Sequence, residues 1–161
     1  MLTLGLAGAD ALEARLDGFP AELLADLAAK AAALADALAA KVRDDKLSGQ
    51  VLNVVSGDLR ASIVGEASIE GDDVVGSVGS AGDVKYAAIQ EYGGKTAAHE
   101  ILPSKGGALA FLVGGALRFA KRVEHPGSTI PERSYLRSSL ENMTDEIVET
   151  LGRSPADVWE R

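Results

Sequence analysis

An alanine-rich stretch from Pro20 to Asp45 most constrains how this chain folds. Alanine has the highest helix propensity of all residues. The larger apolar side chains recur at helical spacing: Leu23, Leu27, Leu34, Leu38 and Val42. This pattern predicts one long helix, whose small alanines allow close packing against a sheet or a neighbouring subunit. A shorter helix is expected before it, capped by Asp10 and stopped by Gly18.

Beyond this helix the apolar pattern changes to a period of two, which is typical of strands. Residues 63–78 alternate on both sides of a Gly-Asp-Asp turn, and the alternation predicts a β-hairpin. A second hairpin is expected in the apolar segment 109–123, which a Gly-Gly pair interrupts at 114–115. Two-residue hairpin turns need positive φ, which glycine adopts readily.

Further short helices are predicted after Ser56, which suits an N-cap position, and over residues 84–92. A longer one is expected from about residue 134 to Leu151, where leucine, methionine and isoleucine recur at helical spacing. The lone Trp159 lies in what is predicted to be a tail, residues 153–161, where it docks either on this chain or on a partner.

The order of these elements predicts an α+β fold, in which an antiparallel sheet of hairpins packs against a long N-terminal helix and a C-terminal helix. The chain has 161 residues, enough for one domain with a sizeable core. A single domain is therefore expected over residues 1–152, with the sheet region at about 63–123 and the tail at 153–161.

Composition narrows the classes of function. The formal net charge of −8 argues against broad binding of nucleic acid, which depends on neutralising phosphates. No uncharged apolar run approaches the length of a membrane span, and the first residues do not have the pattern of a signal peptide. Cysteine is absent, which removes disulfides and thiolate metal sites.

Candidate chemistry is confined to two histidines, His99 and His125, each beside a glutamate, Glu100 and Glu124. Histidine and glutamate can bind zinc or serve as an acid–base pair. Adjacent side chains diverge on a strand or a helix, however, and no metal motif, nucleophile elbow or phosphate-binding loop is present. The sequence therefore predicts no catalytic residue, metal site or cofactor, and a protein that is not an enzyme. A small metal-dependent hydrolase or nuclease that uses His99 and His125 is the alternative.

Four short motifs follow one another between Ser56 and Leu151. They are Ser-Gly-Asp-Leu-Arg-Ala-Ser-Ile at 56–63, Lys-Tyr-Ala-Ala-Ile-Gln-Glu-Tyr-Gly at 85–93, His-Pro-Gly-Ser at 125–128 and Ile-Pro-Glu-Arg-Ser-Tyr-Leu-Arg at 130–137. In this order they resemble the neck and tail-completion proteins of long-tailed phages, the gene-product-ten-like family, and the related virion morphogenesis proteins of Mu-like phages. The chain departs from the family pattern at Ser134, where proline is usual, and in a long insert over 98–123.

The resemblance implies a structural virion protein at the head–tail junction or the top of the tail, which joins or caps the tail as a homo-oligomeric ring. A hexamer is one form of such a ring, and a tail terminator ring is an alternative position. The implied partners are other neck, portal-adaptor or tail proteins, with passing contact to DNA in the channel and none to a membrane. The implied location is the virion, after assembly in the host cytoplasm. A cellular adaptor or scaffolding module unrelated to virions is a further alternative.

Spare strand edges can complete the sheet of a neighbouring subunit, and head-to-tail contacts can close into a ring. The basic set at 118–122 suits an acidic partner surface or DNA, or else a solvated strand face. Contacts to other subunits are expected from the loop 125–133, the segment 86–94 and the hairpin 109–123. The candidate interface residues are Tyr86, Glu91, Tyr92, Gly93, Arg118, Lys121, Arg122, His125, Pro131, Arg133 and Tyr135. Roles inside the chain, as core or as helix ends, are the alternative for the residues outside the basic set.

Overall fold

The computed structural model describes residues 8–53, 55–104 and 106–161. The expectation about a signal peptide falls in part on residues 1–7, outside the described residues. The chain divides into two compact units: unit 1 comprises Met1–Lys85 and Ser134–Arg161, and unit 2 comprises Tyr86–Arg133. Both units fall largely within residues 1–152, the range that the sequence predicts to be one domain.

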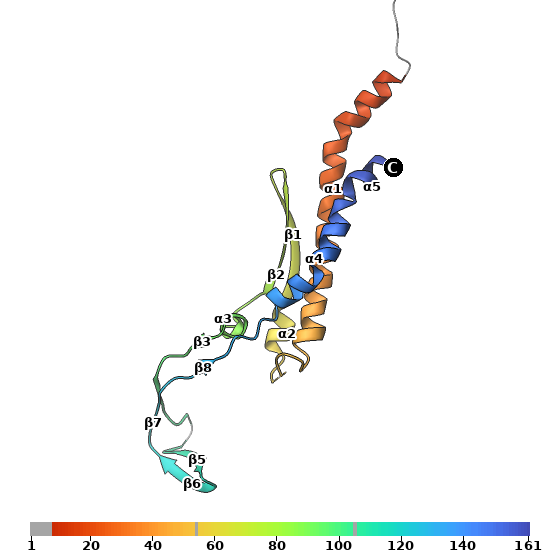
Figure 1. Ribbon diagram of the computed structural model, residues 1–161. Helices are drawn as coiled ribbons and strands as arrows, with labels where there is room; N and C mark the ends of the chain where they lie inside the picture. The colour runs from red at the N-terminus through yellow and green to blue at the C-terminus, as the bar shows by residue number, and fades with distance from the viewer. Residues whose placement is uncertain (1–7, 54, 105) are drawn as a thin grey trace, which may run out of the picture. The chain divides into compact units, whose positions relative to one another are not determined.

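Unit 1 is built along a single helix, α1, which runs from Ala9 to Lys41 and continues as one π-helical turn, η1, over Val42–Lys46 (Figure 1). The prediction of two helices separated at Gly18 is wrong, because α1 passes through that glycine and through Pro20 without a break. Asp10 is not the cap either. It lies in the first turn, and Gly8 precedes the helix without a side-chain cap.

The hairpin predicted after the long helix is confirmed. Strand β1 (Ile63–Glu70) pairs antiparallel with β2 (Asp73–Ser80), in a register that sets Ile63 opposite Ser80 and Glu70 opposite Asp73. Both strands pack against α1, and the buried side chains of α1 on this side are mostly alanines. The small residues therefore bring helix and strand backbones close together, as the composition of the helix predicts.

The first of the four motifs connects α1 to this hairpin. Its short helix α2 covers Asp58–Ser62, and Gly57 rather than the predicted Ser56 occupies the N-cap position. Leu59 and Ile63 are buried, as the spacing predicts. Arg60 is exposed, but its guanidinium donates to the backbone oxygen of Arg43 at 3.1 Å and pairs with Asp44 at 2.8 Å. The motif thus ties β1 to the end of the long helix.

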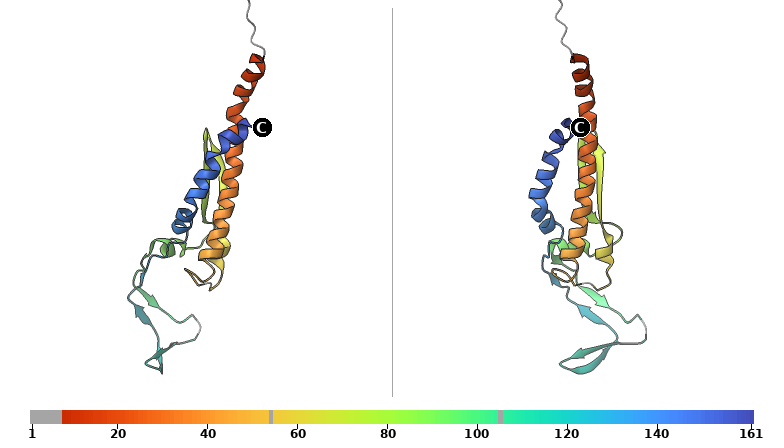
Figure 2. Two further views of the ribbon diagram at one scale, coloured as in Figure 1. Left: turned by 45° about the vertical axis from the view of Figure 1, so that its right-hand side comes forward. Right: turned by 90° about the vertical axis from the view of Figure 1, so that its right-hand side faces the viewer.

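Two C-terminal helices complete unit 1. Helix α4 covers Arg137–Gly152, as predicted apart from its first turn, and α5 covers Ser154–Trp159 within the segment predicted as a tail. Both contact α1. Figure 2 shows α4 and the β1–β2 hairpin on different sides of α1. The predicted α+β fold, with a long N-terminal helix, antiparallel hairpins and a C-terminal helix, is confirmed, and the β1–β2 hairpin and α4 pack against α1.

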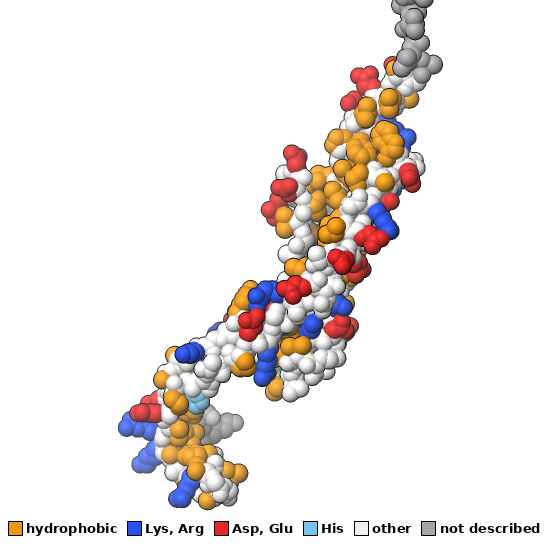
Figure 3. Space-filling view, viewed as in Figure 1, with side chains coloured by type: hydrophobic (Ala, Val, Ile, Leu, Met, Phe, Trp, Pro, Cys, Tyr) orange, Lys and Arg blue, Asp and Glu red, His pale blue; other side chains and the backbone are white. Residues whose placement is uncertain are grey.

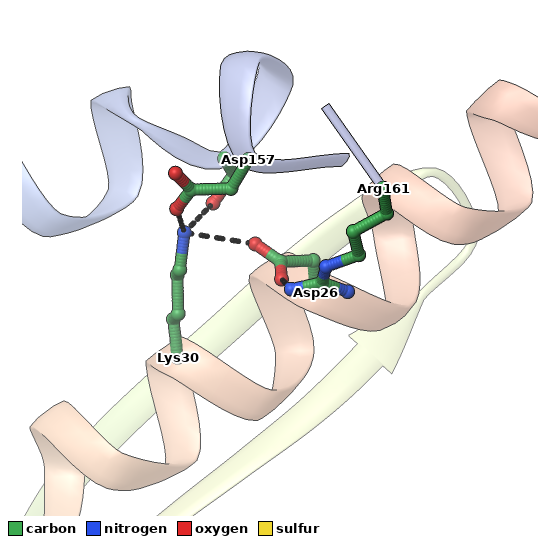
Figure 4. Close-up of polar contacts among 5 residues, drawn as sticks. Asp26, Lys30, Asp157 and Arg161 are labelled. Carbon is green, nitrogen blue, oxygen red and sulfur yellow. Dashed lines mark hydrogen bonds and ion pairs between the residues drawn. The ribbon is translucent and has the colours of Figure 1, made fainter. Parts of the chain in front are cut away.

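A cluster of charges holds α5 against α1 (Figure 4). The Lys30 ammonium lies 2.9 Å from Asp26 on its own helix and 2.5 Å from Asp157 on α5, and it donates to the Ser154 hydroxyl at 3.1 Å. The Arg161 guanidinium pairs with the other oxygen of Asp26 at 2.5 Å. The i,i+4 pair between Asp26 and Lys30 follows from sequence spacing. Its partners on α5 are set by the tertiary fold.

Trp159 docks on this same chain and explains why α1 is continuous. Its ring meets Phe19 edge to face with centroids 5.8 Å apart, and the Arg15 guanidinium lies 4.7 Å from the ring centroid. Arg15 also donates to the backbone oxygen of Trp159. These contacts lie on the N-terminal side of Pro20, and the charge cluster lies on its C-terminal side. Contacts with α5 thus stabilise both sides of the proline, which offsets the backbone hydrogen bond that proline cannot donate.

The charge cluster predicts how unit 1 responds to pH. The hydrogen bond from Lys30 lowers the pKa of Asp26 from 3.8 to about 2, while the hydrogen bond to Asp157 raises the pKa of Lys30 above 10.5. A lowered carboxyl pKa contributes stability that is complete above about pH 4 and is lost as the pH falls toward 2. A raised lysine pKa contributes stability below pH 10.5 that is lost as the pH rises through the raised value.

Emission from the only tryptophan, Trp159, should report this release of α5 from α1 directly. We expect its spectrum to shift to longer wavelength between about pH 4 and 2 and again in the alkaline range. Asp26→Asn should remove most of the acid step, whereas Asp36→Asn, at an exposed position of the same helix, should retain it. An acid step of equal size in both variants would contradict the role of Asp26.

Unit 2 consists of short elements. Helix α3 (Ala87–Tyr92) lies within the predicted range 84–92 but is shorter. The strands of unit 2 are β3 (Gly94–Lys95), β4 (His99–Ile101), β5 (Leu109–Val113), β6 (Ala116–Ala120), β7 (Val123–His125) and β8 (Thr129–Ile130). The hairpin at Gly114-Gly115 is confirmed, and both glycines have positive φ. The prediction that β6 continues to Val123 is wrong, because β7 is a separate strand with a different partner.

None of the helices among the described residues is long and apolar enough to cross a membrane.

Candidate subunit-interaction surface

The strands of unit 2 form three ladders of two strands each, β3–β8, β4–β7 and β5–β6. We call residues 94–130 the arm. Within the described part of the arm, every strand has one hydrogen-bonded neighbour, so each strand keeps one unpaired edge. Unpaired edges can accept a strand from another chain. The prediction of spare strand edges thus has a structural counterpart, although strands β3 and β8 were not expected.

The His-Pro-Gly-Ser motif closes the base of the arm. The amide of Gly127 donates to Nδ1 of His125 at 3.0 Å. The amide of Ser128 donates to the Thr96 hydroxyl at 2.8 Å, and the amide of Thr96 donates to the Ser128 oxygen at 2.9 Å. Gly127 has a φ of +87°, and its backbone lies directly against the Thr96 carbonyl. His125 and Gly127 therefore stabilise the turn that joins the two sides of the arm.

The β4–β7 ladder brings together the two histidines that the sequence singled out. His99 is opposite His125, and their rings stack with centroids 5.0 Å apart. Glu100 is opposite Glu124 and, because side chains alternate along a strand, the glutamates lie on the other face from the histidines. The described residues contain no group of three or more metal-ligating side chains. The ladder therefore supplies two imidazoles, but it does not unite them with the glutamates.

One face of the β5–β6 hairpin is apolar and exposed. The register pairs Ala110 with Phe119 and Leu112 with Leu117, and alternation places all four side chains on the same face, which we call the arm face. Leu112 is 71% exposed, Leu117 59% and Phe119 67%. An isolated two-stranded hairpin is marginally stable in water, and clustered exposed apolar side chains commonly mark an interaction site. The arm face is thus the strongest candidate for contact with another chain.

The predicted basic residues lie on the other face of the hairpin or just beyond the end of β6. Arg118 is paired with Phe111 on the opposite face of the hairpin, as the alternation predicts. Lys121 and Arg122 follow the end of β6, and both are exposed. Arg122 lies 3.4 Å from Glu100. The space-filling view shows basic side chains around this end of unit 2 (Figure 3).

The candidate interface residues around α3 have different environments. Tyr86 and Tyr92 are exposed, whereas Glu91 is buried at 2% exposure. A side chain at Gly93 would meet the backbone of Glu132, so this glycine serves packing within unit 2. The two tyrosines thus lie at the surface, while Glu91 and Gly93 contribute to the fold of unit 2.

The last motif, residues 130–137, begins in unit 2 and ends in unit 1, which the chain re-enters at Ser134. Pro131 and Arg133 are exposed, and the Arg133 amide donates to the Gln90 oxygen at 3.0 Å. Tyr135, in unit 1, is only 1% exposed. Its aromatic ring is part of the core of this chain, which is the alternative that the sequence left open.

Sequence reasoning placed the hairpin among the contact segments but did not single out Ala110 or Leu112. The signal was present, since Ala110 and Leu112 alternate with Phe111 and Val113, and Leu117 with Arg118. Only the register shows which residues of the two strands share a face.

Comparison of the chain with models of known families, with curated proteins and with solved structures found no match.

Proposed function

We propose that this chain is a structural subunit of a tailed-phage particle, which forms a homo-oligomeric ring at the neck or at the top of the tail and joins or completes the tail there. The four ordered motifs between Ser56 and Leu151 support the class of protein. A tail terminator ring is the alternative position within the same class.

The observation that carries this proposal is the arm face. Leu112, Leu117 and Phe119 expose most of their surface to water, which is unfavourable by roughly 1.5–3 kcal/mol for each large apolar side chain that stays unburied. A second chain that covers this hairpin would recover that free energy and pair its open strand edges. A subunit whose role is to bind neighbouring subunits accounts for such a surface, whereas in an isolated monomer the exposed apolar side chains contribute no stability.

The hydrolase alternative depends on the stacked pair His99 and His125. Two imidazoles alone leave a metal with too few protein ligands for the usual catalytic zinc site, which has three. One imidazole is also engaged, because His125 Nδ1 accepts the Gly127 amide. A structural role at the base of the arm accounts for His125 without a reaction.

Deletion of the gene from the parent phage tests the proposal. We expect capsids and tails that stay unjoined, or tails of aberrant length, in electron micrographs, with infectivity restored by the wild-type gene. Complementation with Leu117→Ser should fail, because a polar group replaces part of the arm face, while Val148→Ser, at a similarly exposed apolar site on α4, should restore infectivity. Normal infectious particles without the chain would overturn the proposed function.

A further inference from the structure

Unit 1 contains a groove that is lined mostly by apolar side chains. It has a volume of about 470 Å³ and lies between α1, β2 and α4. Its floor is formed by α1 at Leu34 and Leu38, with Val74 and Val78 on the β2 side and Leu140 on the α4 side. Figure 3 shows hydrophobic side chains between the hairpin and the helices.

The rim of this groove is acidic. Among the described residues that line it, the charged ones are Asp72 and Asp73, at the turn between β1 and β2. Acidic side chains gather at this end of the hairpin in Figure 3. An apolar trough with a negative rim selects an apolar segment that carries positive charge beside it.

The arm has this chemistry. Between Glu100 and Glu124 the sequence has four basic residues and no acidic one, although the whole chain has a net charge of −8. The arm face is apolar throughout. Arg118 lies between Leu117 and Phe119 in β6, with its side chain on the opposite face, and Lys121 comes two residues after Phe119. The long side chains of arginine and lysine can extend from an apolar contact to reach charges at its edge.

We propose that the arm face of one copy docks in the apolar groove of a second copy of this chain, with Arg118 and Lys121 at the rim against Asp72 and Asp73. The two surfaces lie on different parts of the same chain, so the contact is heterologous, and repeating it from copy to copy produces a closed ring if the rotation closes. This inference deepens the proposed function and rests on it only in assuming that the chain assembles with itself.

Cysteine cross-linking tests the contact, because the wild-type chain has no cysteine and only introduced thiols react. One preparation carries Leu112→Cys on the arm face, and a second, tagged preparation carries Leu140→Cys at the groove. The control preparation carries Leu12→Cys, at a leucine on α1 that is 50% exposed, close to the 48% of Leu140. Mild oxidation of equal mixtures should yield the arm–groove dimer at least about tenfold faster than the arm–control dimer, because docking raises the effective concentration of the thiols.

Equal rates in the two mixtures would overturn the contact. A chain that carries both Leu112→Cys and Leu140→Cys shows whether the cross-link forms within one copy or between two copies. Cross-linking within single copies, and not between copies, would show that the arm covers its own groove and would also overturn the proposal. Thermal unfolding of each variant shows that the comparison uses folded protein.

A charge swap tests which charged side chains meet at the rim of the groove. Arg118→Glu alone and Asp72→Lys alone should each weaken association about tenfold at low salt, because each variant sets like charges at the rim. Mixing the two variants restores opposite charges at every mixed contact and should restore association, measured by sedimentation velocity. Failure of the mixture to exceed the single variants would contradict the assigned orientation.

The outcomes separate this inference from the proposed function. Normal infectious phage after deletion of the gene, together with fast arm–groove cross-linking, would reject the virion role and keep the contact. A defective phage without the gene, together with equal cross-linking rates, would keep the virion role and reject the contact.

Discussion

Gly65→Ala should lower the free energy of unfolding of unit 1 by about 3 kcal/mol, because overpacking a close backbone contact forces helix and strand apart. A Cβ atom at this position would lie 2.4 Å from the Ala35 carbonyl oxygen and 2.6 Å from its carbon. Both are backbone atoms in the middle of α1, so no side-chain rotation relieves the clash. Urea unfolding followed by Trp159 emission and by circular dichroism measures the loss.

Gly79→Ala is the matched control. Gly79 lies in β2 opposite Val64, the neighbour of Gly65 along β1, and a Cβ atom there would meet nothing within 4 Å. We expect this variant to stay within about 0.5 kcal/mol of the wild type, as is usual for surface substitutions. Equal unfolding midpoints for the two variants would show that β1 does not approach α1 this closely.

The contrast between these glycines shows what the sequence could and could not predict about unit 1. Strand periodicity and the Gly-Asp-Asp turn are local signals, and they predicted the β1–β2 hairpin. Alanine content predicted a helix that packs closely. Neither identifies Gly65 as the point of closest approach, because that depends on the register of the strand against Ala35.

Long-range contacts overrode the local signals elsewhere. Gly18 and Pro20 predicted a break between two helices, yet α1 is continuous, because α5 contacts it on both sides of the proline. The helix α5 within the segment predicted as a tail was not expected, because its contacts are also long-range. Lys30 and Asp157 are far apart in the sequence, so spacing alone cannot pair them.

The candidate surface was predicted in outline only. The Gly-Gly turn located the β5–β6 hairpin, and alternation separated Arg118 from Leu117 and Phe119. Strands β3, β7 and β8 have only two or three residues each, too few for a recognisable period, and β3 and β8 pair across the whole insert. The burial of Tyr135 was also not predictable, since aromatic residues are favoured in cores and interfaces alike. The burial of Glu91 was not predictable because glutamate is mostly exposed in folded proteins.

Gly127→Ala should disrupt the base of the arm. The φ of +87° at this residue is unfavourable for alanine, and a Cβ atom would lie 2.3 Å from the Thr96 carbonyl oxygen. The amides of Thr96 and Ser128 would lose their mutual hydrogen bonds as the two sides separate, and His125 would lose the donor at its Nδ1. We expect local protection of residues 94–130 to fall by about 3 kcal/mol or more, measured by amide hydrogen exchange.

Gly106→Ala isolates the steric part of this effect. Its φ of +88° matches that of Gly127, but a Cβ atom there would meet nothing within 4 Å. Alanine at Gly106 should therefore lower the local stability of the arm only by the cost of placing alanine at a positive φ, about 1 kcal/mol. Because Trp159 belongs to unit 1, its emission should be unchanged in both variants. Only Gly127→Ala should slow cross-linking between Leu112→Cys and Leu140→Cys chains, since a frayed base no longer presents the arm face as one surface. Equal protection in the two variants would mean that the turn at Gly127 does not hold the arm together.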